Sequence, residues 1–128
     1  MTPLIASIIF GFIKGLTVEG GSEEEDFSWN TDLWGPAKEE FMYRAVPLKL
    51  VPKLPYGTTA IFFAADHLMD DYKAGYQLDA KQVLARLGDT FFGGLTYETA
   101  FRRHGYLAAL ACHASHNVAV GLGSRLRR

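Results

Sequence analysis

The chain has 128 residues, which is enough for one domain and short of two. Apolar residues make up 48% of it, so a packed core can form, and 13 Lys and Arg balance 14 Asp and Glu. This near-neutral charge, with no basic stripe, argues against a nucleic-acid partner. The single cysteine, Cys112, excludes an intrachain disulfide, and its apolar surroundings predict a core residue rather than a reactive thiol.

The N-terminal part begins with an apolar stretch, residues 3–16, that predicts a helix. No basic segment precedes this stretch and no small-residue cleavage site is evident, so we interpret it as a retained helix, inserted or docked, rather than as a signal peptide. An acidic connector follows over residues 20–26. Trp29 and Trp34 come next, and they suit a membrane interface or a small packed cap equally well.

A second helix is expected to open at residues 35–36, because proline is favoured in a first helical turn. Pro47 weakens it, and the prolines at positions 52 and 55 end it. The helix carries Glu40 and Arg44, which are four residues apart and can therefore pair on one face. Glu39 is offset by about 100 degrees and is free to point elsewhere. Taken alone, this group predicts a surface helix with one ion pair.

A third helix is expected from about Gly57, ending near His67 before a polar connector over residues 70–79. His67 lies one turn beyond Phe63 on the same face. Taken alone, a histidine at this position is usually a packed or capping residue, and its charge would be mildly favourable near a helix C-terminus.

A fourth helix is expected over residues 80–103. Its adjacent glycines, Gly93 and Gly94, would permit a neighbouring helix to approach closely. Its charged residues exclude free exposure to lipid; they include Arg86, Asp89 and Glu98.

A fifth helix is expected over residues 106–122, inside an uncharged run that is long enough to span a bilayer. His113 and Asn117 are one turn apart on it and share a face, whereas His116 lies on another side. Polar groups are costly in such a run, so they indicate either a functional site or a structural network that links helices. The tail, residues 125–128, is basic and suits a solvated terminus or a membrane flank.

No alternating period-2 pattern of useful length is present, so the predicted fold is all-α. We expect a compact bundle of about five helices, partly membrane-embedded, although a mean hydropathy of +0.02 is low for a protein with several membrane spans. The predicted organisation is an N-terminal helix and connector over residues 1–33, a helical core over residues 34–124, and the basic tail.

Four polar residues on three predicted helices are explained better as parts of one site than as separate residues. A glutamate can act as general base toward water, and a histidine can share that role or bind a metal. An asparagine amide and a second histidine are suitable donors to a developing oxyanion. Glu39, His67, His113 and Asn117 therefore predict amide hydrolysis, in a chain with neither an HExxH motif nor a nucleophile elbow around Ser115.

These residues also belong to three short motifs, EExxxR, FxxxH and HxxxN, which occur in this order along the chain. The matching residues are Glu39-Glu40…Arg44, Phe63…His67 and His113…Asn117. The set resembles the CPBP (CAAX-processing and bacteriocin-processing, Abi-type) family of intramembrane proteases, over roughly residues 34–123. The chain departs from the family in having one apolar segment before this core, where several membrane helices are usual, and in having Ala45 where glycine is common.

The resemblance implies a role for each matching residue. Glu39 and His67 would activate a water, and Glu40 and Arg44 would support the site. His113 and Asn117 would stabilise the oxyanion. Alternatively, Glu39, His67 and His113 would hold a zinc ion; no other cofactor is implied.

The function expected from the resemblance is membrane-bound hydrolysis of a peptide bond in a hydrophobic or prenylated peptide or protein substrate, with lipid as a further partner. The alternative is a non-catalytic relative that acts as a structural or binding subunit of an oligomer or larger assembly. A third interpretation is a soluble helical domain whose motif match is accidental.

Overall fold

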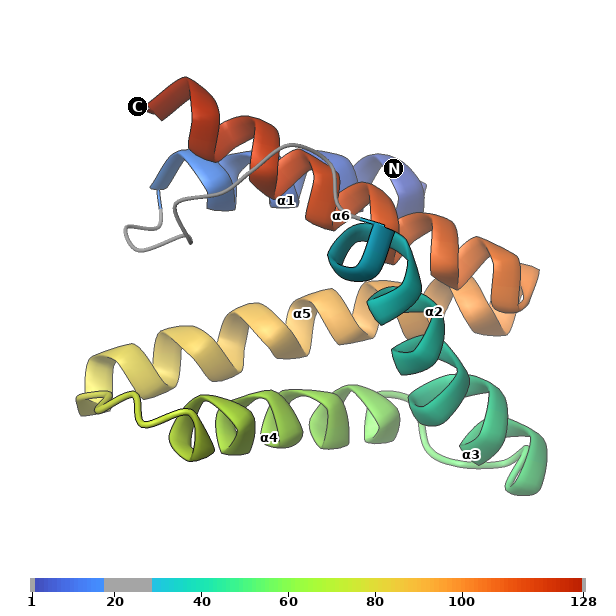
Figure 1. Ribbon diagram of the computed structural model, residues 1–128. Coiled ribbons are helices and arrows are strands. Elements are labelled where there is room, and N and C mark those ends of the chain that lie inside the picture. Colours follow the sequence, from blue (N-terminus) through green and yellow to red (C-terminus); the bar gives the residue numbers. More distant parts are fainter. Residues whose placement is uncertain (1, 18–28, 128) are drawn as a thin grey trace.

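The computed structural model describes residues 2–17 and 29–127, and within these ranges the chain is helical with no strand (Figure 1). The acidic connector expected over residues 20–26 lies outside the described residues. The all-α prediction is confirmed. The helical elements are α1 (Pro3–Thr17), η1 (Asn30–Trp34), α2 (Gly35–Glu40), η2 (Phe41–Ala45), α3 (Val46–Leu50), α4 (Thr58–Lys73), α5 (Ala80–His104) and α6 (Tyr106–Arg127).

The helices form two packed pairs joined by a crossing segment (Figure 1). Helices α1 and α6 run side by side in the same direction, and α4 and α5 form an antiparallel hairpin. The segment from η1 to α3 crosses one end of both pairs. None of the helices in the described ranges combines the length and the apolar character that a membrane crossing requires.

Glycines bring α1 and α6 into backbone contact. A Cβ atom added to Gly15 would lie 2.2 Å from the carbonyl oxygen of Val120, and one added to Gly123 would lie 2.4 Å from that of Phe12. Small residues permit such close helix packing. Helix α1 therefore packs on the face of α6 that points away from the segment carrying Glu39.

The second helix begins earlier than the proline pattern predicts, and it ends just before Pro52, as predicted. It starts in η1, before residues 35–36, and continues through Pro47 to Leu50. A wide π-helical turn precedes each of its two prolines, and the amide groups of Gly35 and Val46 bond to carbonyls five residues back. A turn of this kind accommodates a residue that has no N–H to donate, which explains why Pro36 and Pro47 do not break the helix.

The polar residues after His67 extend α4 rather than forming a connector from residue 70. Helix α4 runs to Lys73, because Asp71 in its last turn pairs with Arg86 of α5 through an Nε–Oδ2 contact of 2.6 Å. The actual connector is residues 74–79. It leads into a capping box in which Asp79 and Gln82 each accept the other's backbone N–H.

A small core lies beneath the polar residues of the predicted site. Phe63, Tyr97, Ala100 and Cys112 are buried against one another. Cys112 is 3% exposed, so the prediction that it is a core residue is confirmed, and this burial raises the pKa of its thiol. This core fixes the relative positions of α4, α5 and α6.

Candidate active site

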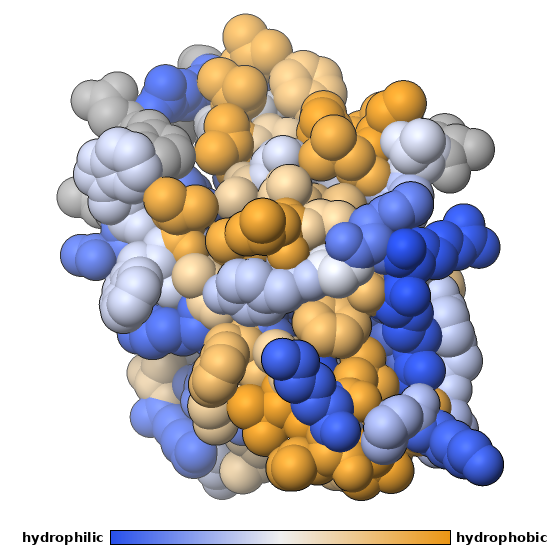
Figure 2. Space-filling view, turned by 90° about the vertical axis from the view of Figure 1, so that its right-hand side faces the viewer, coloured by the Kyte–Doolittle hydropathy of each residue, from blue (hydrophilic) through white to orange (hydrophobic). Residues whose placement is uncertain are grey.

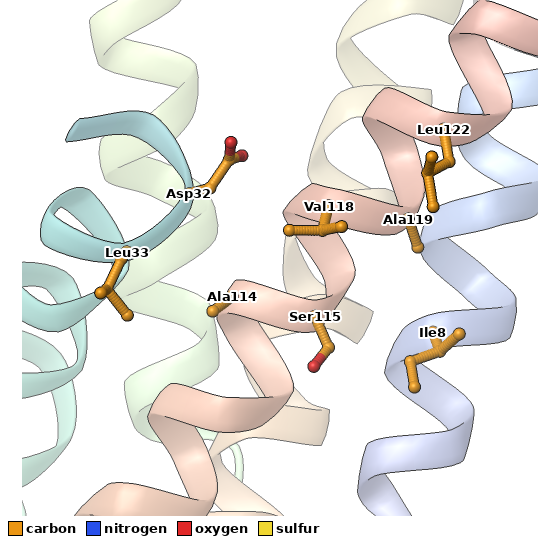
Figure 3. Close-up of a pocket in the computed structure, with 8 residues that line it drawn as sticks. All are labelled: Ile8, Asp32, Leu33, Ala114, Ser115, Val118, Ala119 and Leu122. Atoms are coloured by element: carbon orange, nitrogen blue, oxygen red, sulfur yellow. The ribbon is translucent and has the colours of Figure 1, made fainter. Parts of the chain in front are cut away.

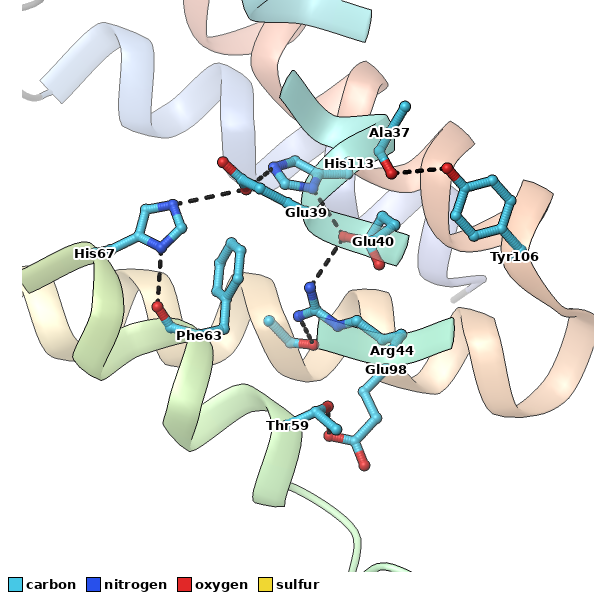
Figure 4. Close-up of polar contacts among 11 residues, drawn as sticks. Ala37, Glu39, Glu40, Arg44, Thr59, Phe63, His67, Glu98, Tyr106 and His113 are labelled. Carbon is cyan, nitrogen blue, oxygen red and sulfur yellow. Dashed lines mark hydrogen bonds and ion pairs between the residues drawn. The ribbon is translucent and has the colours of Figure 1, made fainter. Parts of the chain in front are cut away.

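Three of the four predicted site residues converge from three helices (Figure 4). Glu39 comes from α2, His67 from α4 and His113 from α6. One carboxylate oxygen of Glu39, Oε2, lies 3.7 Å from Nε2 of His67 and 3.5 Å from Nε2 of His113. The same oxygen is buried and has no hydrogen-bond partner among the described residues. The two histidines therefore face one unsatisfied oxygen.

The other ring nitrogen of each histidine is already engaged. Nδ1 of His67 lies 2.8 Å from the carbonyl oxygen of Phe63, and Nδ1 of His113 lies 2.8 Å from Oε1 of Glu40. A carbonyl or carboxylate oxygen only accepts, so both Nδ1 atoms must donate. In the neutral rings both Nε2 atoms then carry lone pairs directed toward the Glu39 carboxylate. Three acceptors around one point attract a proton donor such as water, or a cation.

Beneath this group, Glu40 and Arg44 form a fully buried ion pair. Nη1 of Arg44 donates to Oε1 of Glu40 at 3.0 Å, and Nη2 donates to the carbonyl oxygen of Gly94 at 3.0 Å. Burial lowers the pKa of Arg44, and the Glu40 charge opposes that shift. The predicted pairing is confirmed. The alternative of a surface ion pair is wrong, because the helix turns this face toward α5 and α6.

The close approach expected at Gly93 and Gly94 occurs at Gly94. A Cβ atom there would lie 3.1 Å from Nη2 of Arg44 and 3.2 Å from the Cα atom of Ala60 on α4. Glycine thus leaves room for the guanidinium under the site.

Aromatic rings hold the two histidines in place. The Phe63 ring lies 4.1 Å from that of His67, as their spacing on one helix face predicts. Tyr97 of α5 stacks on His113 at 4.3 Å with an interplanar angle of 12°. Tyr97 was not predicted from the sequence, where its only signal is a position one turn after Gly93.

The site is open on one side and closed on the other. The Glu39 side chain is 34% exposed and that of His67 is 23% exposed, whereas that of His113 is only 6% exposed. Asn117 follows His113 by one turn of α6 and is half-buried. Its role as an oxyanion donor stays a prediction.

The donor types suit zinc, which binds imidazole nitrogen and carboxylate oxygen. The engaged Nδ1 atoms also match the hydrogen bonds that orient metal-bound histidines. However, no set of three or more His, Cys, Asp or Glu side chains in the described ranges is arranged to hold a metal ion. The zinc site at Glu39, His67 and His113 stays a prediction.

A second buried carboxylate, Glu98 of α5, was noted in the sequence only as a charge. It accepts hydrogen bonds from the Thr59 hydroxyl at 2.6 Å and from the Gly57 amide at 3.1 Å, at the start of α4, and from Nε of Arg102 at 2.8 Å. Burial alone would raise the Glu98 pKa, but these hydrogen bonds outweigh it, and the pKa is lowered. Glu98 therefore fixes the helix that carries His67.

His116 lies on a different side of α6 from His113, as predicted. It is buried against α1, where its Nδ1 lies 3.2 Å from the Ser7 carbonyl oxygen and its ring stacks on Phe10 at 5.9 Å. Burial and, secondly, Lys14 lower its pKa to about 4. His116 is thus a neutral packing residue and lies outside the site.

An apolar groove of about 340 Å³ lies between α1, η1 and α6 (Figure 3). None of the predicted site residues lines it. The lining residues are Ile8, Asp32, Leu33, Ala114, Ser115, Val118, Ala119 and Leu122.

Comparison with known proteins adds no relative: no family model, curated protein or solved structure matches the chain.

Proposed function

We propose that the chain is a membrane-associated peptidase of the CPBP kind that hydrolyses a peptide bond in a hydrophobic or prenylated substrate. One observation carries the proposal: the buried, unsatisfied Oε2 of Glu39 lies between the Nε2 atoms of His67 and His113, at 3.7 and 3.5 Å. A water held at this point would meet a general base and two nitrogens whose orientation is fixed.

The reaction follows from these roles. Glu39 takes a proton from the water while the oxygen of the water attacks the carbonyl carbon of the scissile bond. Asn117 donates to the negative oxygen that forms, as does His113 in its protonated form, in which Nε2 carries a hydrogen; His67 shares the proton with Glu39. The proton then passes to the amide nitrogen, the C–N bond breaks, and the products are a carboxylic acid and an amine. A zinc ion bound by Glu39 and the two histidines would supply a more acidic water.

Association with a membrane is the second part of the proposal. Large apolar side chains are exposed on every long helix, and α1 alone exposes Leu4, Ile5, Ile8, Ile9, Phe10, Ile13 and Leu16. Exposed apolar area of this extent marks an interaction surface. Trp29 and Trp34 are 70% and 60% exposed, which disagrees with a packed cap and favours the interfacial position that tryptophan prefers.

The substitution Glu39→Gln tests the peptidase function, because it keeps the side-chain shape and removes the base. We expect hydrolysis of a fluorogenic apolar peptide to fall at least about a hundredfold, the scale of general-base catalysis. Asp70→Asn, an exposed acid on α4, is the matched control and should keep full activity. A chelator such as 1,10-phenanthroline separates the two chemistries, since it inhibits only a metal-dependent enzyme. Equal activity of Glu39→Gln and wild type would refute the proposal.

A non-catalytic relative, serving as a structural or binding subunit of a larger assembly, is the second candidate. It is favoured by the complete burial of Glu40, Arg44 and Glu98, because buried ion pairs can serve to specify helix packing. It predicts a folded wild-type chain with no hydrolysis of any peptide in a panel that includes prenylated substrates.

A further inference from the structure

One end of the molecule combines positive charge with exposed apolar side chains. It is built from residues 45–57, which include α3 and the loop after it, and from residues 99–110, where α5 ends and α6 begins. We call this surface the basic end. The two segments are joined directly, since Nη2 of Arg102 donates to the carbonyl oxygen of Leu54 at 2.8 Å and the Tyr56 hydroxyl bonds to Thr99.

The charge of the basic end has one sign. Its two segments contain Lys49, Lys53, Arg102 and Arg103 and no aspartate or glutamate. Arg102 is neutralised by the buried Glu98. Lys49, Lys53 and Arg103 are exposed, and none of the three forms an ion pair within the described ranges. Three unneutralised cations therefore face solvent together.

Apolar side chains stand among these cations. Leu50 is 77% exposed, Leu107 is 76% exposed, and Val51 and Tyr56 are at least half exposed. Figure 2 looks onto this end of the molecule and shows long hydrophilic side chains lying across a hydrophobic surface in its lower half. Several apolar side chains exposed close together mark an interaction surface, and covering a leucine that is three-quarters exposed would be favourable.

We propose that the basic end docks on an anionic phospholipid surface, with the three cations at the headgroups and the leucines in the acyl boundary. The charge complementarity selects an anionic partner, and cations near such a surface each contribute measurably to binding. Nucleic acid would meet the cations but leave Leu50 and Leu107 in water, so lipid fits both features. The inference rests on the membrane part of the proposed function and does not require peptidase activity.

The test is co-sedimentation of the purified full-length chain with two kinds of vesicle. One kind is phosphatidylcholine alone, and the other contains about one part phosphatidylserine to two parts phosphatidylcholine. We expect preferential binding to the anionic vesicles that weakens as salt is raised. The triple variant Lys49→Gln, Lys53→Gln, Arg103→Gln should bind them on the order of a hundredfold more weakly, from about 1 kcal/mol per cation.

A matched triple variant, Lys38→Gln, Lys73→Gln, Lys81→Gln, removes the same charge from exposed positions elsewhere and should bind the anionic vesicles as wild type does. The double variant Leu50→Gln, Leu107→Gln should lose binding to the same vesicles even at low salt.

The outcomes separate the two proposals. Equal binding to both kinds of vesicle would keep the membrane association and overturn the basic-end inference, and so would equal losses in the two triple variants. An oligonucleotide that binds the wild-type chain and the leucine double variant equally well, and displaces the wild-type chain from the vesicles, would assign the basic end to nucleic acid instead. An absence of binding to either vesicle would refute the inference together with the membrane association. Glu39→Gln should bind as wild type does, because docking needs no hydrolysis.

Discussion

Acidification should destabilise the protein through His116, the histidine buried between α6 and α1. Its pKa is about 4 in the folded chain, because of burial and then the nearby Lys14, against 6.5 for the free side chain. Between these values the unfolded chain binds the extra proton, so the free energy of unfolding falls as pH falls. A pKa difference of about 2.5 at 1.36 kcal/mol per unit corresponds to about 3 kcal/mol. The contribution of the buried neutral His116 to the free energy of unfolding is therefore complete above about pH 6.5 and lost by about pH 4.

The assay is urea unfolding followed by far-UV circular dichroism in a mild non-ionic detergent, at a series of pH values across this window. His116→Gln is the comparison variant, because glutamine does not titrate and can still donate to the Ser7 carbonyl oxygen. We expect wild type to lose about 3 kcal/mol more than His116→Gln between pH 7.5 and pH 4, whatever the carboxylates contribute to both. Parallel pH profiles of the two proteins would refute the assignment of a buried neutral His116.

Two further predictions concern packing, and one concerns chemistry. Gly15→Ala places a Cβ atom 2.2 Å from the Val120 carbonyl oxygen, so it should lower the free energy of unfolding by about 1–3 kcal/mol, whereas Gly121→Ala, with open space around it, should be neutral or stabilising in the same urea assay. Glu98→Gln should cost about 2 kcal/mol by thermal unfolding, because it weakens charged hydrogen bonds in a buried network. Glu39→Gln, in contrast, should leave thermal stability nearly unchanged while activity is lost.

The helices were largely predictable because hydrophobic runs and breakers act locally. The boundaries of the helices were less predictable where tertiary contacts or unusual turns decide them. The pairing of Asp71 with Arg86 extends α4, and a π-helical turn lets the second helix continue past Pro47. The glycine pair of α5 was recognised because the two residues are adjacent. Gly15 and Gly123 were missed because their close approach depends on which helices pack together, and no local pattern states that.

In the candidate site, too, some residues could be predicted from local patterns and others depend on how the helices pack. Glu39, His67 and His113 were selected because polar residues on apolar helices require an explanation, and the structure brings all three together. Tyr97 and Glu98 lie on α5, a helix with many charges, so neither stood out in the sequence. Both support the site without belonging to it: Tyr97 stacks on His113, and Glu98 fixes the start of α4. Such support depends on helix packing rather than on spacing along the chain.

The most direct test of the account is peptide hydrolysis in water enriched in oxygen-18. We expect the wild-type chain to cleave an apolar or prenylated peptide and to place one labelled oxygen in the new carboxyl group. Glu39→Gln should form almost none of this product, and Asp70→Asn should form it normally. Unchanged product formation by Glu39→Gln would contradict the account, and so would a folded wild-type chain that cleaves no peptide.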